Sequence, residues 1–208
     1  MEAVKQTNGA YVMIPSTPAG ILTGQQLTKI AELVNEGAGL AKLTSGQRIA
    51  IVTSEDKIDS VREGLASVGL TLGPLGNVIR NVKGCAGLLC DFGNQDVIKH
   101  SMDLDGAFSG KEMPFALKMG ISGCARNCVE VKSKDIGFLA TPSGYKVFIG
   151  GQGGGAQVLG NLLIENVQPE EMNEVVSQVL KVYVENAKGK ERLVKTVQRI
   201  GLEAFKIV

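Results

Sequence analysis

The sequence predicts an α+β fold made of two successive parts. Apolar residues recur with period 2 in some segments and at helical spacing in others, so strands and helices are mixed along the chain. The 208 residues include 27 glycines, which is well above the usual share of roughly 7% and indicates many tight turns. All four cysteines fall between residues 85 and 128. We therefore expect one part over residues 1–76 and a second, cysteine-bearing part over residues 77–208.

The composition excludes several classes of protein. Hydrophobic residues make up 44% and charged residues 21% of the chain, as in a globular protein and unlike a disordered one. The formal net charge of +1 argues against nucleic-acid binding driven by charge. No apolar run reaches the roughly 18 residues of a membrane span, and the first residues lack the order of a signal peptide. We expect a cytoplasmic protein that binds no membrane and no nucleic acid.

The first part is expected to begin with a strand and a helix. Residues 11–14 form a short apolar run that ends at Pro15, as a strand does before a turn. Thr23 is the expected N-cap of the helix that follows, and Gly37 is expected to end it. Apolar residues at helical spacing give this helix one buried face: Leu27, Ile30, Ala31 and Val34.

A hairpin and a second helix are expected to complete the first part. Apolar strands over residues 40–44 and 48–53 are separated by a short turn that contains glycine, which is a hairpin signal. We predict that Thr53 or Ser54 caps the next helix and that Gly69 closes it. The resulting strand–helix–strand–strand–helix order predicts a ferredoxin-like half-domain.

The second part is expected to carry the cysteines after two strands. A strand over residues 78–82 leads to the first pair, Asn94 or Asp96 caps a helix, and a strand over residues 115–121 leads to the second pair. In that last strand, alternation puts the bulky side chains of the odd positions on one face. The other face is nearly smooth and bears one ammonium group: Ala116, Lys118, Gly120 and Ser122. We expect a flat ligand to lie on it.

The chain is expected to close with a hairpin and two helices. Strands over residues 135–141 and 145–150 surround a turn with proline and glycine. The glycine-rich segment 150–155 is either a flexible loop or a nest of backbone N–H groups for an anion. Two amphipathic helices follow Pro169 and end at Gly201, and their apolar faces are typical of a core.

The cysteines form two close pairs. Cys85 and Cys90 have C-x4-C spacing, and Cys124 and Cys128 have C-x3-C spacing. Because a cytosolic chain keeps its thiols reduced, a metal centre is favoured over disulfides, with inert core thiols as a further interpretation. Zinc also binds thiolate pairs of such spacing. His100, the single histidine, is predicted to be a surface or packing residue rather than a ligand.

A series of short motifs accompanies these pairs in a fixed order: Leu43-Thr-Ser-Gly-Gln47, Arg80-Asn-Val-Lys-Gly-Cys-Ala-Gly-Leu-Leu-Cys90, Phe92-Gly-Asn-Gln-Asp96, Ile121-Ser-Gly-Cys-Ala-Arg-Asn-Cys128, Asp135-Ile-Gly-Phe138, Val147-Phe-Ile-Gly-Gly151 and the tail from Glu191 to Glu203. Together they resemble the siroheme-dependent nitrite and sulfite reductase family, in particular its small, single-repeat, assimilatory-type sulfite reductases. The resemblance covers roughly residues 15–205.

The resemblance implies a [4Fe–4S] cluster on Cys85, Cys90, Cys124 and Cys128, with Cys128 also bridging to the iron of siroheme. Cysteine thiolates are the usual ligands of such clusters. The implied activity is the six-electron reduction of sulfite to sulfide, or of nitrite to ammonia, with a donor such as a ferredoxin. Because larger family members contain two such halves and this chain contains one, the resemblance also implies a homodimer.

Siroheme carries many carboxylates and the substrate is a small oxyanion, so the site requires cations and hydrogen-bond donors. The resemblance assigns catalytic roles to Arg80, which precedes the first cysteine pair, and to Lys118 on the smooth strand face. The candidates for cofactor binding are Lys42, Thr44, Gln47, Arg48, Arg80, Lys83, Arg126 and Asn127.

Some positions depart from the family pattern. Gly46 stands where the family has an arginine, and Ala116 stands where a lysine is common. The first pair has C-x4-C spacing where C-x5-C is usual, and Ala125 replaces a common proline. With two substrate cations absent, a second interpretation stays open, in which the chain is a siroheme or cluster carrier for electron transfer or binding without turnover.

Overall fold

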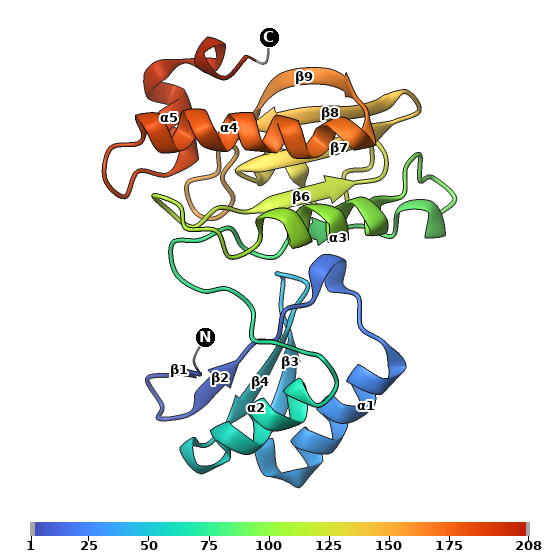
Figure 1. The fold of residues 1–208 in the computed structure, drawn as a ribbon, viewed down its shortest axis with the longest axis vertical. Helices are drawn as coiled ribbons and strands as arrows, with labels where there is room; N and C mark the ends of the chain where they lie inside the picture. The colour runs from blue at the N-terminus through green and yellow to red at the C-terminus, as the bar shows by residue number, and fades with distance from the viewer. Residues whose placement is uncertain (1–2, 207–208) are drawn as a thin grey trace. The chain divides into compact units, whose positions relative to one another are not determined.

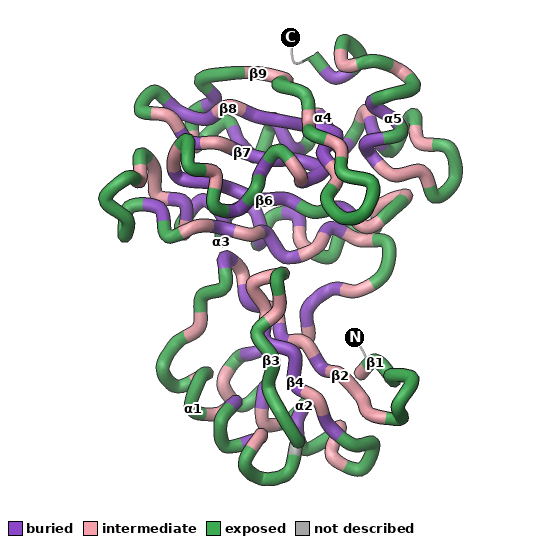
Figure 2. Tube along the Cα trace, turned by 180° about the vertical axis from the view of Figure 1, so that it is seen from behind, coloured by how far each residue is buried: buried purple, intermediate pink, exposed green. Residues whose placement is uncertain are grey.

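The structure is a computed structural model that describes residues 3–206, so the outermost residues of the two predicted parts, 1–2 and 207–208, lie outside the described residues. The chain divides into two units, Met1–Pro74 and Leu75–Val208. Each unit is a sheet with helices packed on it (Figure 1), and the buried residues concentrate within each sheet and its helices (Figure 2). The predicted α+β class is confirmed.

Unit 1 has the predicted ferredoxin-like order, preceded by one short strand that was not predicted. Its four antiparallel strands are arranged β1-β2-β4-β3: β1 Val4–Lys5, β2 Tyr11–Met13, β3 Leu40–Leu43 and β4 Ile49–Thr53. Two helices, α1 Gly24–Leu33 and α2 Ile58–Ala66, pack against each other. Their apolar faces and the inner face of the sheet share one core: Met13, Ile30, Leu33, Ile49, Ile51, Val61, Leu65 and Leu70.

The two predicted helix caps of unit 1 have different outcomes. Thr23 caps α1 as predicted: its hydroxyl accepts from Gln26 N at 3.2 Å, and the Gln26 side chain accepts from Thr23 N at 3.0 Å. The predicted cap of α2 at Thr53 or Ser54 is wrong. A turn of 3-10 helix, Glu55–Lys57, intervenes, and the Ser54 hydroxyl donates to Asp56 rather than capping a backbone N–H.

Unit 2 has a five-stranded sheet in chain order: β5 Lys83–Gly84, β6 Met119–Ser122, β7 Ile136–Thr141, β8 Gly144–Ile149 and β9 Asn161–Val167. Strands β5, β6 and β7 are parallel, whereas β7, β8 and β9 are antiparallel. The helices are α3 Val97–Phe108, α4 Met172–Asn186 and α5 Leu193–Ile200. Asp96 caps α3 by accepting from Lys99 N at 3.1 Å, and the hairpin and both closing helices are present as predicted.

Two strand predictions in unit 2 require correction, and one further strand was not predicted. Residues 78–82 are not a strand: only Val78 and Ile79 make isolated bridges, and the strand is the next two residues. The strand predicted over 115–121 is reduced to Met119–Ser122, because the residues before it make only a single bridge at Leu117. Strand β9 was not predicted, because most of its side chains are exposed and show no apolar alternation.

The expected open face of β6 is covered. Gly120 and Ser122 are both buried, since β6 lies between two strands and the chain after Cys128 folds back over it. A Cβ atom at Gly120 would lie 2.9 Å from Val129 Cγ1 and 3.3 Å from Lys134 Cγ. The prediction of a ligand lying on this face is therefore wrong at Gly120 and Ser122, whereas Lys118 remains exposed.

Candidate functional site

The two cysteine pairs lie at the same edge of the unit 2 sheet. Gly84, the last residue of β5, pairs with Ile121 of β6 in a parallel register, so the chain leaves both strands at their carboxyl ends. Cys85 follows β5 at once, and Cys124 follows β6 after one intervening residue. The loop of each pair therefore begins beside the other loop. This is the arrangement that a centre with ligands from both loops requires.

The sulfur of Cys85 is placed by backbone amides of both loops. Gly123 N donates to Cys85 Sγ at 3.0 Å, and Gly87 N donates to the same sulfur at 3.5 Å. A Cβ atom at Gly123 would lie 3.3 Å from both Cys85 Sγ and Gly87 Cα. Hydrogen bonds to sulfur tune the potential of an iron–sulfur cluster. The local structure therefore suits Cys85 as a cluster ligand.

Side chains from the first loop also hold the second. The backbone N and the side-chain Nδ2 of Asn94 both donate to Gly123 O, at 2.9 and 3.2 Å. The Arg126 guanidinium lies over the Phe92 ring at 3.5 Å from its centroid, a cation–π contact between the loops. Cys90 and Cys128, the last cysteine of each pair, are exposed. The last cysteine of each pair is therefore accessible from solvent.

Asn127, which was predicted to bind cofactor, is engaged in its own loop. It has a positive φ of 54°, and its Oδ1 accepts from Val131 N at 2.8 Å and from Ser122 Oγ at 3.3 Å. Ser122 Oγ in turn accepts from Val129 N at 3.1 Å. The Asn127 amide therefore fixes the turn that presents Cys128.

The chemistry of the donor set suits an iron–sulfur cluster, because cysteine thiolates are the usual ligands of such clusters. Among residues 3–206, no three side chains of His, Cys, Asp or Glu are grouped so that they could hold one metal ion. Four reduced cysteines on two adjacent loops, one of them accepting two N–H bonds, are a suitable set for such a cluster.

Apart from Arg126 in the second cysteine loop, the cationic candidates of unit 2 lie on strand β5 or just before strands β5 and β6. Arg80 is half-buried and its Nη2 donates to Gly76 O at 2.9 Å; burial lowers its pKa, although a guanidinium stays charged in proteins. Lys83 pairs with Gly120, and Lys118 lies two residues before Gly120. A further lysine, Lys134, lies over the same strand and is 6% exposed. Lys134 was not among the candidates predicted from the sequence, because a lysine in a polar turn normally remains in solvent.

The other candidates belong to unit 1. Thr44, Gln47 and Arg48 line a cavity of about 530 Å³ within that unit, whereas Lys42 lies exposed on β3 and does not line it. Thr44 Oγ1 accepts from Arg48 N at 3.3 Å and donates to Arg48 O at 2.9 Å, which fixes the turn after β3. A Cβ atom at Gly46 would lie 3.5 Å from Arg48 Nε. The guanidinium of Arg48 therefore lies beside the position where the family has its arginine.

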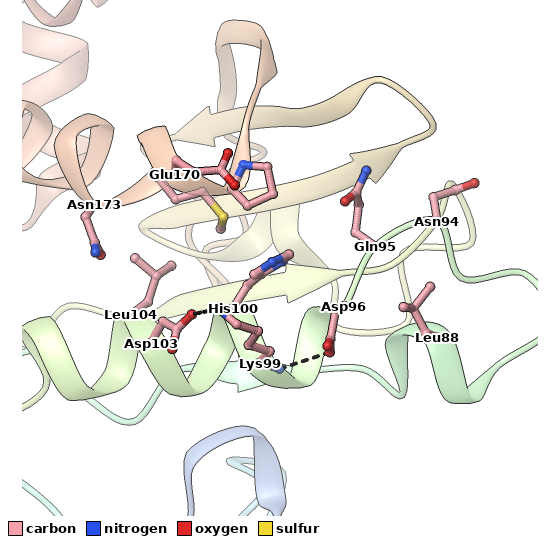
Figure 3. A pocket seen from close by; sticks show the side chains of 12 residues that line it. Leu88, Asn94, Gln95, Asp96, Lys99, His100, Asp103, Leu104, Glu170 and Asn173 are labelled. Atoms are coloured by element: carbon pink, nitrogen blue, oxygen red, sulfur yellow. Dashed lines mark hydrogen bonds and ion pairs between the residues drawn. The ribbon is translucent and has the colours of Figure 1, made fainter.

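A second cavity, of about 710 Å³, lies in unit 2 beside the first cysteine loop (Figure 3). His100 lines it and is 9% exposed, with Nδ1 2.8 Å from the buried Tyr145 hydroxyl. Burial lowers the pKa of His100 and raises that of Tyr145, so the imidazole is neutral at neutral pH. His100 is thus a packing residue of the core, consistent with its predicted role.

Comparison with protein families identifies the chain. The description "Nitrite and sulphite reductase 4Fe-4S domain" matches residues 75–208, and "Nitrite/Sulfite reductase ferredoxin-like half domain" matches residues 4–68. The chain belongs to the nitrite and sulfite reductase family. The predicted resemblance is therefore confirmed, as is the order of a ferredoxin-like half-domain followed by a domain of the [4Fe–4S] type.

Relatives in the family differ in length and in name. An assimilatory-type sulfite reductase of Nitratidesulfovibrio vulgaris is 29% identical, and the alignment covers 94% of this chain and 90% of that protein. A nitrite reductase (NAD(P)H) of Bacillus subtilis is 34% identical over 97% of this chain, which spans only 25% of that protein. A protein of Priestia megaterium named cobalt-factor III methyltransferase is 29% identical over 86% of this chain and 32% of that protein.

Solved structures share the fold at low sequence identity. Dissimilatory sulfite reductase I superposes with a TM-score of 0.85 at 16% identity, over 94% of this chain and 68% of that chain. The NirA protein of Mycobacterium tuberculosis superposes with a TM-score of 0.80 at 21% identity, over 99% of this chain and 41% of that chain. These likenesses establish the fold of the family.

Within residues 3–206, none of the helices has the length and apolar character needed to cross a bilayer.

Proposed function

We propose that the chain is a single-repeat reductase that binds siroheme and a [4Fe–4S] cluster and reduces sulfite to sulfide, with nitrite as the competing substrate. The observation that carries the proposal is the parallel pairing of β5 with β6, which starts both cysteine loops at one edge of the sheet. The match to an assimilatory-type sulfite reductase over 90% of that protein's length supports sulfite as the substrate.

Cys85, Cys90, Cys124 and Cys128 would hold the cluster through their thiolates, and Cys128 would also hold siroheme next to the cluster. When bound, the siroheme–cluster pair supplies electrons one at a time to a reaction that consumes six. The backbone amides of Gly87 and Gly123 hold the Cys85 sulfur in place. The exposed position of Cys128 allows a second group to approach its sulfur.

The protein's cations are proposed to bind and orient the oxyanion. A hydrogen bond from Arg80 Nη2 to Gly76 O orients the Arg80 guanidinium. The backbone of Lys118 is held by a hydrogen bond of 2.9 Å from Lys118 N to Asp135 Oδ2. Preorganised donors of this kind stabilise developing charge without reorganisation, and removing one typically lowers the rate about 10²–10³-fold. The electron donor is proposed to be a ferredoxin-like protein, and the oligomer a homodimer, which light scattering over a range of concentrations tests.

The decisive experiment is viologen-driven reduction of sulfite and of nitrite by purified protein whose siroheme and cluster contents are verified. We expect turnover of sulfite, and we expect Arg80→Ala to lower it about 10²–10³-fold while the visible spectrum of the cluster is unchanged. Cys128→Ser is expected to lose the coupling of the two cofactors, and Cys85→Ser to destabilise the cluster. Absence of turnover of both anions by fully loaded protein would reject the reductase.

A second candidate function is that of a siroheme or cluster carrier without turnover. The specific observation in its favour is the loss of two side chains, since Gly46 and Ala116 stand at positions of family cations. The same loaded protein distinguishes the two: a carrier exchanges electrons with the viologen and releases neither sulfide nor ammonia. Restoring the cation with Ala116→Lys, two residues before Lys118, is expected to raise turnover in a reductase and to leave a carrier inactive.

A further inference from the structure

The first cysteine loop presents two successive leucines to solvent. A turn of 3-10 helix, Gly87–Leu89, lies between Cys85 and Cys90, and in it Leu88 is 61% and Leu89 is 82% exposed. A single exposed leucine is ordinary, whereas adjacent exposed apolar side chains are typical of a contact surface. A protein that covers these two leucines would contact the loop that carries two of the candidate cluster ligands.

The cavity of about 710 Å³ in unit 2 adjoins these leucines, since Leu88 lines it (Figure 3). Its volume is in the usual range of binding pockets. Part of its lining is apolar: Leu88, Leu104, Pro169 and Met172. Among the described residues, its charged lining consists of three carboxylates and one ammonium group: Asp96, Asp103, Glu170 and Lys99. The cavity therefore combines an apolar lining with an excess of negative charge, in a chain of formal net charge +1.

Lys99 does not neutralise these carboxylates. Its Nζ is 2.7 Å from Asp103 Oδ2, but both side chains are exposed, and such pairs contribute little. Asp96 accepts from the backbone N of Lys99 as the cap of α3. Glu170 belongs to the turn Pro169–Glu171 on the opposite side of the cavity (Figure 3). Within residues 3–206, its carboxylate accepts no hydrogen bond.

A buried imidazole nitrogen also faces the cavity. His100 lines the cavity and is 9% exposed, and its Nδ1 is 2.8 Å from the hydroxyl of the fully buried Tyr145. No residue in the described part of the chain forms a hydrogen bond with the other ring nitrogen, Nε2. When Nδ1 donates to Tyr145, Nε2 is an acceptor. A hydrogen-bond donor that enters the cavity would therefore find an acceptor in His100 as well as in the carboxylates.

A lysine side chain has the chemistry that this cavity lacks. It consists of an apolar stem and an ammonium group with three donors and no acceptor. The apolar lining suits the stem, and the carboxylates with His100 Nε2 suit the ammonium. An acidic side chain would be repelled, and an apolar one would leave the polar groups of the cavity without partners.

We propose that Leu88, Leu89 and this cavity form the docking surface for an electron-transfer protein whose face carries lysines, one of which enters the cavity. At each encounter the partner's reduced centre loses one electron, which passes through the first cysteine loop to the cluster. The inference rests on the proposed function for the need of electrons, and it adds the charge of the partner's face. Complementary charge raises the rate at which such partners meet.

The test measures electron transfer from the loaded, reduced protein to two acceptors of opposite charge, a basic c-type cytochrome and an acidic plastocyanin, by stopped-flow absorbance. At low ionic strength we expect the cytochrome to react at least about tenfold faster, because steering by charge raises association rates by such factors. Added salt should slow the cytochrome and remove most of the difference. A cytochrome rate that does not depend on salt, or a faster plastocyanin, overturns the proposal.

Variants locate the surface. Glu170→Gln removes one charge from the cavity, and Glu185→Gln removes one from an exposed position of α4 that does not line it. At low ionic strength we expect Glu170→Gln to slow the cytochrome reaction about fivefold and Glu185→Gln to leave it unchanged. Leu89→Gln should slow it also in high salt, because apolar contacts are not screened. Iron and acid-labile sulfide are measured in each variant, and equal rates for the two glutamine variants at equal cluster content overturn the proposal.

Crosslinking detects the lysine contact itself. A carbodiimide joins a carboxylate to a lysine amine where the two groups are in contact. With the cytochrome, we expect mass spectrometry to find Glu170 joined to a cytochrome lysine and Glu185 unmodified by the cytochrome. Crosslinks to the cytochrome only at carboxylates outside the cavity overturn the proposal. So does a crosslink between two copies of the chain at Glu170, together with loss of a dimer in Leu89→Gln by light scattering.

The proposed function and the docking surface fail separately. Electron transfer to the cytochrome requires no turnover of sulfite or nitrite, and crosslinking requires no bound cluster. A chain that reacts with the cytochrome as expected but reduces neither anion would lose the proposed function and keep the surface. A chain that reduces sulfite with viologen, but in which Glu170→Gln behaves as Glu185→Gln does, would keep the proposed function and lose the surface.

Discussion

The two units bury different kinds of side chain. Among the described residues of unit 1, the buried polar residues are two threonines, Thr17 and Thr53, and the core is otherwise apolar. Unit 2 buries ionisable groups as well: His100, Asp105, Lys134 and Asp135. Burying a charge costs free energy unless it is paired and hydrogen-bonded. Burying such groups lowers the free energy of unfolding of the unit that contains them. In this chain that unit is unit 2, which also contains the four cysteines.

The buried ionisable groups of unit 2 lie beside the strands that lead to the cysteine loops. Asp135 accepts from Lys118 N, and its neighbour Lys134 covers Gly120, so both act on the strand that leads to the second cysteine loop. Asp105 Oδ1 accepts from Val82 N at 2.7 Å, at the start of the strand that leads to the first loop. Asp135 and Asp105 therefore hold the backbone just before strands β6 and β5, which lead to the two cysteine loops.

The largest effect is expected from breaking the buried ion pair of unit 2. Arg192→Met leaves the Asp135 carboxylate, which is 1% exposed, without its bidentate partner. An uncompensated buried charge typically costs about 3–5 kcal/mol, and we expect urea unfolding to show a loss of that size. The control is Lys146→Met, which breaks an ion pair with Glu165 at the surface and should cost at most about 1 kcal/mol. If both variants lost a similar free energy of unfolding, the buried ion pair of unit 2 would be no more important for stability than a surface pair.

Much of the fold could be predicted because it depends on local signals. Thr23 and Asp96 cap α1 and α3 through hydrogen bonds within three residues of the chain, and such caps are visible in the sequence. The strand predicted over residues 115–121 is too long at its start. The alternation of apolar and small or polar residues begins at residue 115, but the residues before Met119 pair with no neighbouring strand except for a single bridge at Leu117. Pairing is a long-range property, and only Met119–Ser122 lies between β5 and β7.

An apolar truncation in unit 1 should produce the next largest effect. Leu65 of α2 is 1% exposed and belongs to the unit 1 core, so Leu65→Ala removes buried methyl groups and leaves a cavity. Such changes cost about 2–5 kcal/mol. We expect a loss of this size by urea unfolding and, in contrast to Arg192→Met, no dependence of that loss on salt concentration. A marked salt dependence would show that charged groups contribute to the unit 1 core.

The candidate site was predictable where chemistry depends on residue type and spacing. Two close cysteine pairs predicted a metal centre, and the structure starts their loops side by side. Lys134 could not be found in the same way, because its burial depends on the chain folding back over Gly120. The contacts of Asn127 within its turn could not be predicted either, because a residue with positive φ and a hydrogen bond from Val131 N has no separate signal in the sequence.

A smaller effect is expected from protonation in the unit 2 core. Burial lowers the pKa of His100 from its usual 6.5, so the unfolded chain binds a proton that the folded chain rejects as the pH falls below that value. The free energy of unfolding should therefore fall on acidification through pH 6.5 and below, by at most about 1.4 kcal/mol per pH unit. His100→Gln should remove this slope, because glutamine does not titrate. Identical pH profiles for parent and variant would reject the assignment.

The smallest effect is expected from restoring a cation in unit 1. Gly46 stands at the position of a family arginine, yet the Arg48 guanidinium already lies beside it, since a Cβ atom at Gly46 would be 3.5 Å from Arg48 Nε. If that guanidinium supplies the missing charge, Gly46→Arg adds little and should change sulfite turnover less than about tenfold, which corresponds to about 1.4 kcal/mol. Arg48→Ala alone should lower turnover more than Gly46→Arg changes it, and the double variant should recover activity. A large gain from Gly46→Arg in the parent would show instead that unit 1 lacks the charge and that Arg48 does not replace it.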